Sequence, residues 1–145
     1  FDSYYRLLRK IYDEKIDDCI IAEDDCQLIE VPKVLPNKLC YLNGRFINAS
    51  SWKKYNEFNK ETGLHEIDYS KSRILGLLGI YIPKYSDIKP IIDMIENSNR
   101  LRAIDIMIMK HRLIKHYIYP ACFYCDDGGY SQIGNKIVGI TKNYK

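Results

Sequence analysis

Three consecutive carboxylates are the clearest chemical signal in this sequence. Glu23, Asp24 and Asp25 follow directly after residues 19–22, a short apolar run that reads CIIA. Because alternate residues of an extended segment point to opposite sides, Glu23 and Asp25 are expected to share one side. Carboxylates this close together repel one another and favour a counter-cation, and hard oxygen ligands suit Mg²⁺ or Mn²⁺, which can bridge to a diphosphate. The spacing alone is equally compatible with a solvated acidic turn.

A further acid, Asp105, interrupts the apolar stretch 103–109. An acid in such surroundings indicates either a functional carboxylate or a helix cap. The capping alternative places Asp105 at the start of a helix over 106–110, where its carboxylate would accept a hydrogen bond from a backbone N–H. The two interpretations are compatible only if the side chain also faces a cleft.

The cysteines indicate packing rather than a metal or redox centre. There are five, an odd number, at positions 19, 26, 40, 122 and 125. The last two form a single CxxC, whereas a zinc site requires a second pair of ligands at a suitable spacing. A redox CxxC opens a helix, but this one runs into the turn sequence DDGG. The cysteines are therefore interpreted as small buried hydrophobes in a reducing compartment, which predicts a cytoplasmic protein.

Other titratable groups carry weaker signals. His65, His111 and His116 are isolated from one another and are interpreted as surface or packing residues. The acidic loop at 126–129 is interpreted as a tight turn, with a late metal ligand as the alternative.

Length and composition define the general class of protein. With 145 residues, the chain is expected to form a single domain over 1–145. Hydrophobic residues make up 46% and charged residues 28%, which supplies enough apolar material for a globular core. The net charge of +3, with lysines scattered along the chain, argues against nucleic-acid binding. No apolar run approaches the roughly 18 residues that a membrane-spanning helix needs.

The spacing of apolar residues predicts alternating helices and strands. Helices are expected over 3–14, from a cap at Ser86 or Asp87 onwards, and over 103–110. Pro90 is tolerated because it lies in the first turn of the second helix. Short apolar runs predict strands at 19–22, 39–42 and 73–82, with further extended segments at 117–119 and 121–124 and a polar excursion over 48–70.

This alternation predicts an α/β fold with a mostly parallel sheet flanked by helices. The continuous apolar run 19–22 is expected to be a central strand, buried on both faces. In open α/β sheets, ligands bind beyond the carboxyl ends of the strands, where the three acids are expected to lie.

Five short motifs resemble, in the same order, the signature segments of the lipopolysaccharide and procollagen galactosyltransferase family. The helix over 3–14 leads into IIAEDD at 20–25, which is similar to a strand ending in the family's LEDD. The run LCYLNG at 39–44 is similar to a strand ending in Leu-Gly, with Asn43 inserted. The sequence GLLGIYIPK at 76–84 fits the glycines of a Gly-Thr-x-Ala/Gly-Tyr strand and the helix after it. AID at 103–105 matches a P-x-D segment, and SQI at 131–133 matches Ser-x-Ile.

The resemblance implies a fold and a chemistry. The implied fold is the Rossmann-like GT-A fold, of which this chain would be the C-terminal catalytic portion without the family's N-terminal segment. The implied activity is transfer of a hexose from a nucleotide-diphosphate sugar, such as a UDP-sugar, to a hydroxyl of a saccharide or glycoprotein acceptor. The implied cofactor is Mn²⁺ or Mg²⁺, and the implied stereochemistry is inversion at the anomeric carbon.

The resemblance also assigns roles to individual residues. It implies that Asp24 and Asp25 bind the metal, with Asp25 as the principal ligand. It implies that Glu23, Asp24 and Gly76 contact the nucleotide sugar. An inverting transfer needs one general base for the acceptor hydroxyl, and Asp105 is predicted to be that base.

Two other classes of function remain open from the sequence. Leu77 and Ile80 stand where the family has Thr and an aromatic residue, and this departure favours a non-catalytic binding or interaction module. The third possibility is an unrelated metal-dependent phosphoryl-transfer or hydrolytic protein that uses the same acidic strand end.

Overall fold

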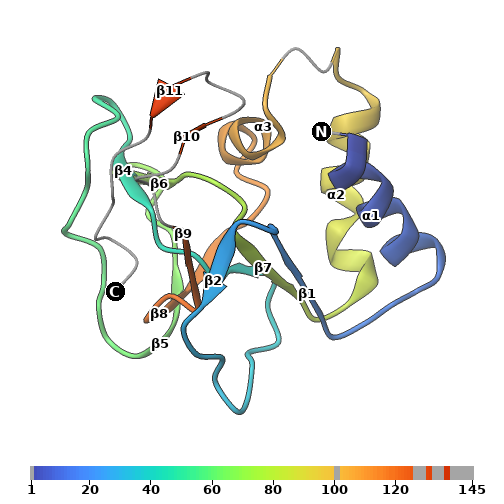
Figure 1. The fold of residues 1–145 in the computed structure, drawn as a ribbon, viewed down its shortest axis with the longest axis horizontal. Coiled ribbons are helices and arrows are strands. Elements are labelled where there is room, and N and C mark those ends of the chain that lie inside the picture. The colour runs from blue at the N-terminus through green and yellow to red at the C-terminus, as the bar shows by residue number, and fades with distance from the viewer. Residues whose placement is uncertain (1, 100–101, 126–129, 132–135, 138–145) are drawn as a thin grey trace.

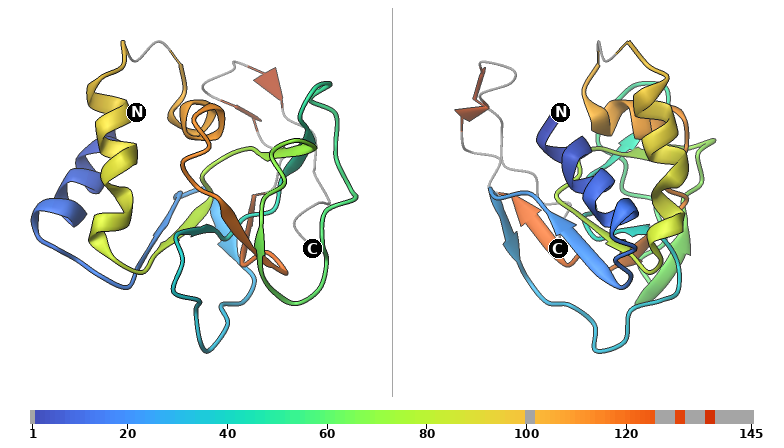
Figure 2. Two further views of the ribbon diagram at one scale, coloured as in Figure 1. Left: turned by 180° about the vertical axis from the view of Figure 1, so that it is seen from behind. Right: turned by 90° about the vertical axis from the view of Figure 1, so that its right-hand side faces the viewer.

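The structure is a computed structural model that describes residues 2–99, 102–125, 130–131 and 136–137. Its helical elements are α1 (Asp2–Asp13), the 3₁₀ turn η1 (Tyr85–Ile88), α2 (Lys89–Glu96) and α3 (Ile104–Lys110). Helices α1 and α2 lie side by side at one end of the molecule, as Figure 1 and Figure 2 show from several directions.

The predicted helices are confirmed, but the predicted cap of the second one is wrong. Helix α1 buries Leu8 and Ile11 on the stripe that the apolar spacing indicated. Pro90 lies in the first turn of α2, as expected. Neither Ser86 nor Asp87 caps this helix, because both belong to η1, and Ile88 is the N-cap without any side-chain hydrogen bond.

The central sheet has five strands in the order β1–β7–β3–β8–β5 (Figure 1). Their bounds are Cys19–Ala22 for β1, Gly79–Ile82 for β7, Cys40–Tyr41 for β3, His116–Tyr119 for β8 and Gly63–Glu66 for β5. Strands β3 and β8 pair in parallel, whereas β1 with β7, β7 with β3 and β8 with β5 pair antiparallel. The expectation of a mostly parallel, Rossmann-like GT-A sheet is therefore wrong.

A glycine divides one of the predicted strands in two. The segment 73–82 was expected to form one strand, but it forms β6 (Ser72–Ile74) and β7, separated by residues 75–78. Gly76 breaks the strand with a φ of +84°, a backbone conformation that glycine adopts readily and β-branched residues avoid. The first half pairs with β4 (Phe46–Asn48), and the second half enters the main sheet between β1 and β3.

Strand β1 lies at the edge of the sheet and not at its centre. It pairs with β7 on one side, and Ile21 is its buried residue, while Ile20 and Ala22 are exposed. Short apolar runs occur both in central strands and in edge strands. The residue types at 19–22 therefore could not show which kind of strand they form. The expectation that residues 19–22 are buried on both faces is wrong.

Two clusters of apolar side chains cover the two faces of the sheet. Alternate residues point to opposite faces of a strand. Ile80 and Tyr117 therefore face a large core that includes the apolar sides of α1, α2 and α3. Tyr81 and Ile118 face a smaller core beneath the ladder formed by β2 (Cys26–Leu28) and β9 (Phe123–Cys125). A separate short ladder joins β10 (Tyr130–Ser131) to β11 (Lys136–Ile137).

Candidate functional site

The three predicted acids lie at the carboxyl end of β1, where that strand turns toward β2. Strands β1 and β3 both run antiparallel to β7, so their carboxyl ends meet the segment that precedes β7. The backbone N–H of Glu23 donates to the carbonyl of Leu78 at 3.1 Å, which fixes the start of the acidic segment against that strand. Glu23 is half-buried, and Asp24 and Asp25 are exposed.

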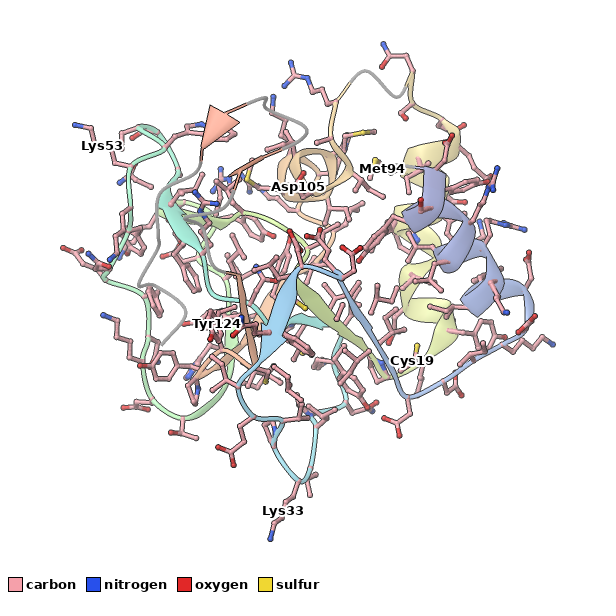
Figure 3. The ribbon with its side chains drawn as sticks, viewed as in Figure 1. Cys19, Lys33, Lys53, Met94, Asp105 and Tyr124 are labelled. Atoms are coloured by element: carbon pink, nitrogen blue, oxygen red, sulfur yellow. The ribbon has the colours of Figure 1, made fainter. Side chains whose placement is uncertain are left out.

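Asp105 reaches the same place from α3. It lies in the first turn of that helix, and its Oδ2 accepts a hydrogen bond from the backbone N–H of Gly76 at 3.2 Å. The N-cap of α3 is Ala103, which makes no side-chain cap, so the interpretation of Asp105 as a cap is wrong. Figure 3 shows Asp105 on α3, above the junction of β1 and β2 in that view.

The electrostatics of Glu23 link the two acidic segments. Burial raises the pKa of its carboxyl, and the negative charges of Asp25, Asp105 and Asp24 raise it further, in that order. Asp105 is 80 residues or more away along the chain, yet it is close enough to act on Glu23 through space. Asp105 therefore lies within electrostatic range of Glu23, and the roles predicted for these acids stay predictions.

Two buried polar side chains border this acidic cluster, and sequence reasoning missed both. Asn43 is fully buried, and its Nδ2 donates to the carbonyls of Leu75 at 3.1 Å and Gly76 at 3.4 Å. Its Oδ1 has no hydrogen-bond partner among the described residues. The hydroxyl of Tyr4 on α1 is likewise buried without a described partner, and burial followed by the charge of Glu23 raises the pKa of that hydroxyl.

Signals for these two residues were present but weak. The pair Asn43-Gly44 is typical of a turn, so its residue types do not indicate a buried side chain. A polar residue at the end of a strongly apolar run was the available sign of burial. Tyr4 belongs to the apolar stripe of α1, so nothing in its spacing distinguishes a hydroxyl near acids from an ordinary core tyrosine.

The chemistry of the acidic cluster fits a hard divalent cation bound together with a phosphate ligand. All of its charged groups offer carboxylate oxygens, the donors that Mg²⁺ and Mn²⁺ prefer. Within the described ranges, no group of three or more His, Cys, Asp or Glu side chains converges as a complete protein cage for a metal. Mg²⁺ is usually held by one or two carboxylates plus substrate phosphates and water, and the exposed pair Asp24 and Asp25 suits that arrangement.

A cavity of about 610 Å³ lies elsewhere, beside β5 at the other edge of the sheet. Apolar side chains dominate its wall, from three segments: 29–36, 62–64 and 118–121. None of the predicted site residues lines it. The three acids therefore do not border this cavity.

The remaining candidates behave as packing or surface residues where they are described. His65 Nε2 lies 2.6 Å from the carbonyl of Glu61, and His111 is exposed at the end of α3. Burial lowers the pKa of His116, which lies at the start of β8. The described thiols of Cys19, Cys26, Cys40 and Cys122 are free. The loop 126–129 and most of the motif at 131–133 lie outside the described residues.

Comparison with known proteins adds no relative to this picture. No protein-family model, no curated protein and no solved structure gives a significant match to the chain. The resemblance to the galactosyltransferases therefore rests on the five motifs alone. In the part of the chain that the structure describes, no helix has the length and apolar character required to cross a membrane.

Proposed function

We propose that this chain is a metal-dependent glycosyltransferase that moves a hexose from a nucleotide-diphosphate sugar to a hydroxyl of a saccharide or glycoprotein acceptor. One observation carries the proposal: Glu23 at the carboxyl end of β1 and Asp105 on α3, which are distant in the sequence, are anchored on the same short segment, Glu23 through its N–H to the carbonyl of Leu78 and Asp105 through the N–H of Gly76. These are the acids to which the motif resemblance gave donor-binding and base roles. A merely solvated acidic turn gives no reason for a further carboxylate, that of Asp105 on α3, to lie near it.

The proposed reaction divides the work among these residues. Asp105 takes the proton from the acceptor hydroxyl, whose oxygen forms a bond to the anomeric carbon. The bond from that carbon to the diphosphate oxygen breaks on the opposite face, and the diphosphate leaves with its electron pair. The N–H of Gly76 donates to Asp105 and orients the carboxylate for this step.

Asp24 and Asp25 are the proposed ligands of Mg²⁺ or Mn²⁺, which as a Lewis acid would supply charge stabilisation to the leaving diphosphate. Glu23 is half-buried, and its backbone N–H donates to the carbonyl of Leu78. Its carboxyl, with a raised pKa, is suited to contact a hydroxyl of the donor sugar. A reducing, cytoplasmic location fits the free thiols of the described cysteines.

Calorimetry tests the metal and donor roles together. UDP-hexoses are titrated into the protein with Mn²⁺ present and with Mn²⁺ removed by a chelator. We expect binding that requires the metal and that disappears in Asp25→Ala. Glu57→Ala is the matched control, because Glu57 is an exposed acid in another segment. Equal affinity with and without metal would remove the metal from the proposal.

A non-catalytic binding module is the alternative, and the position of the large cavity away from the acids favours it. Mass spectrometry of reaction mixtures with saccharide acceptors separates the two. Release of UDP with formation of a glycosylated product supports the transferase, whereas metal-dependent binding without turnover supports the module.

A further inference from the structure

The position of Asn43 is unusual for a polar residue. Its side chain is fully buried at the carboxyl end of β3, beside apolar neighbours such as Leu42 and Cys122. A buried amide that leaves its oxygen without a partner costs free energy, and an apolar side chain of the same size would avoid that cost. Packing alone therefore does not account for an asparagine here.

The two hydrogen bonds that Asn43 donates explain what its amide does. They reach the carbonyls of Leu75 and Gly76, on the segment where the chain leaves β6 and turns into β7. Gly76 itself contributes no side chain to this turn, and its φ of +84° is a conformation that few other residues adopt. Asn43 thus ties this turn at two of its carbonyls, in addition to the burial of Leu77 and Leu78 and the hydrogen bond from the N–H of Leu75 to the carbonyl of Arg45.

The geometry of one peptide group connects this tether to Asp105. The carbonyl of Leu75 and the N–H of Gly76 belong to the same planar peptide unit and point in opposite directions. Asn43 binds the carbonyl end of the unit at 3.1 Å, and Asp105 accepts a hydrogen bond from its N–H end at 3.2 Å. If the carbonyl is held, the direction of the N–H is held as well.

We propose that Asn43 is a positioning residue, which orients the Leu75–Gly76 peptide so that its N–H holds the carboxylate of Asp105 in place for proton transfer. This inference rests on the proposed function of Asp105. It gives a role to the asparagine that interrupts the motif LCYLNG, the point where the sequence departs from the Leu-Gly of the resembled family.

A double-mutant cycle in the kinetics tests the inference. Asn43→Leu keeps the size of the side chain and removes both donors. We expect kcat to fall roughly a hundredfold, the effect of misplacing a catalytic group by about 1 Å, while KM for the sugar nucleotide stays within about twofold. In an Asp105→Asn background, Asn43→Leu should lower kcat no further, because the residue acts through Asp105. Equal fold-losses in both backgrounds would overturn the proposal.

Ser72→Ala is the matched control. Ser72 is also a buried polar residue that donates to a backbone carbonyl, that of Asp68, but it lies on β6 and contacts no acid of the cluster. Its removal should leave kcat and KM unchanged. If Asn43→Leu does not fold, Asn43→Ala repeats the cycle, since it removes the same donors and adds neither bulk nor charge.

Amide hydrogen exchange gives a readout that needs no sugar nucleotide. In Asn43→Leu, the N–H of Gly76 should exchange roughly fivefold faster or more, the effect of losing one hydrogen bond. The N–H of Leu42, which donates to the carbonyl of Gly79, is the reference. Its exchange rate should change only as far as the overall stability of the protein changes. Absence of turnover in the wild-type protein would refute the proposed function, whereas unchanged exchange at Gly76 would refute the tether.

Discussion

The two edge strands of the sheet have opposite surroundings. Beside β1 stand the carboxylates of the acidic segment and of Asp105, which accepts a hydrogen bond from the N–H of Gly76, together with the buried hydroxyl of Tyr4. Beside β5 lies an apolar cavity that is formed by three loops and strand ends. Mutually repelling carboxylates oppose folding, whereas apolar burial favours it. The β1 edge therefore concentrates negative charge, whereas the β5 edge offers a mainly apolar wall to which Glu30 contributes an acid.

Among the variants, Asp105→Asn should lower turnover the most. An unchanged turnover would contradict the functional difference between the two edges. We expect a folded protein with near-normal donor binding and a turnover that is lower by roughly a hundredfold or more, because asparagine cannot accept the proton. Steady-state kinetics with a UDP-hexose and a thermal melt provide the two measurements.

Asparagine is a suitable replacement because its side-chain oxygen can still accept the hydrogen bond from Gly76. Stability should therefore change little. A variant with near-wild-type turnover would remove Asp105 from the mechanism and leave the acidic loop at 126–127 as the next source of a base.

Gly79→Ala tests the packing that joins the two regions. Gly79 is the first residue of β7, close to the acids. The ring of Phe123 on β9, which belongs to the smaller core, packs against it. A Cβ at position 79 would lie 2.5 Å from Cδ2 of that ring, so the ring must move. We expect a loss of about 1–3 kcal/mol in the free energy of unfolding, measured with urea.

A second substitution identifies the cause of that loss. Phe123→Leu removes the ring, so adding Gly79→Ala to it should cost much less than in the wild type. Additive losses would show that the glycine is required for a reason other than the contact with Phe123.

The reactivity of a cysteine thiol should depend on whether it lies at the edge of the sheet or at its centre. Burial raises the pKa of Cys40 on β3 to about 12 and that of Cys122 to about 11, so both remain protonated thiols until the pH approaches those values. Cys19 on the edge strand β1 and Cys26 on β2 are partly exposed. At pH 8, iodoacetamide should label these two at least about tenfold faster, as peptide mapping would show. Equal rates at Cys19 and Cys40 would contradict the edge position of β1.

The sequence predicted the local parts of this molecule well. The strand 19–22 and the three helices were confirmed because each depends on a few neighbouring residues. Asp105 was predicted to return toward the carboxyl edge of the sheet, and it lies within electrostatic range of Glu23. Its chemistry stays a prediction.

The errors concern the pairing of distant segments. Parallel and antiparallel neighbours need the same apolar residue types, so the run 19–22 did not reveal that β7 would pair with it antiparallel. Strand β5 was missed inside the polar excursion because Gly63 and His65 give it no apolar alternation. The cavity beside it combines three segments, none of which carries a signal alone.

Val34→Asp should have the smallest effect on stability, and it sharpens the comparison at the β5 edge. Val34 lines the apolar cavity but is 85% exposed, so its replacement should change the free energy of unfolding by no more than about 0.5 kcal/mol. The same change places a negative charge at the rim of the cavity and removes apolar surface. An anionic dye with an apolar body, anilinonaphthalene sulfonate, should therefore bind several-fold more weakly, by roughly 1 kcal/mol.

Ile20→Asp is the control, because Ile20 is a partly exposed apolar residue of the β1 edge that does not line the cavity. Since this control adds the same charge to the protein, it separates a local effect from a change in net charge. If both variants bound the dye equally weakly, the dye would be binding to exposed apolar residues in general and not to the cavity. The two edges would then differ less than their residues indicate.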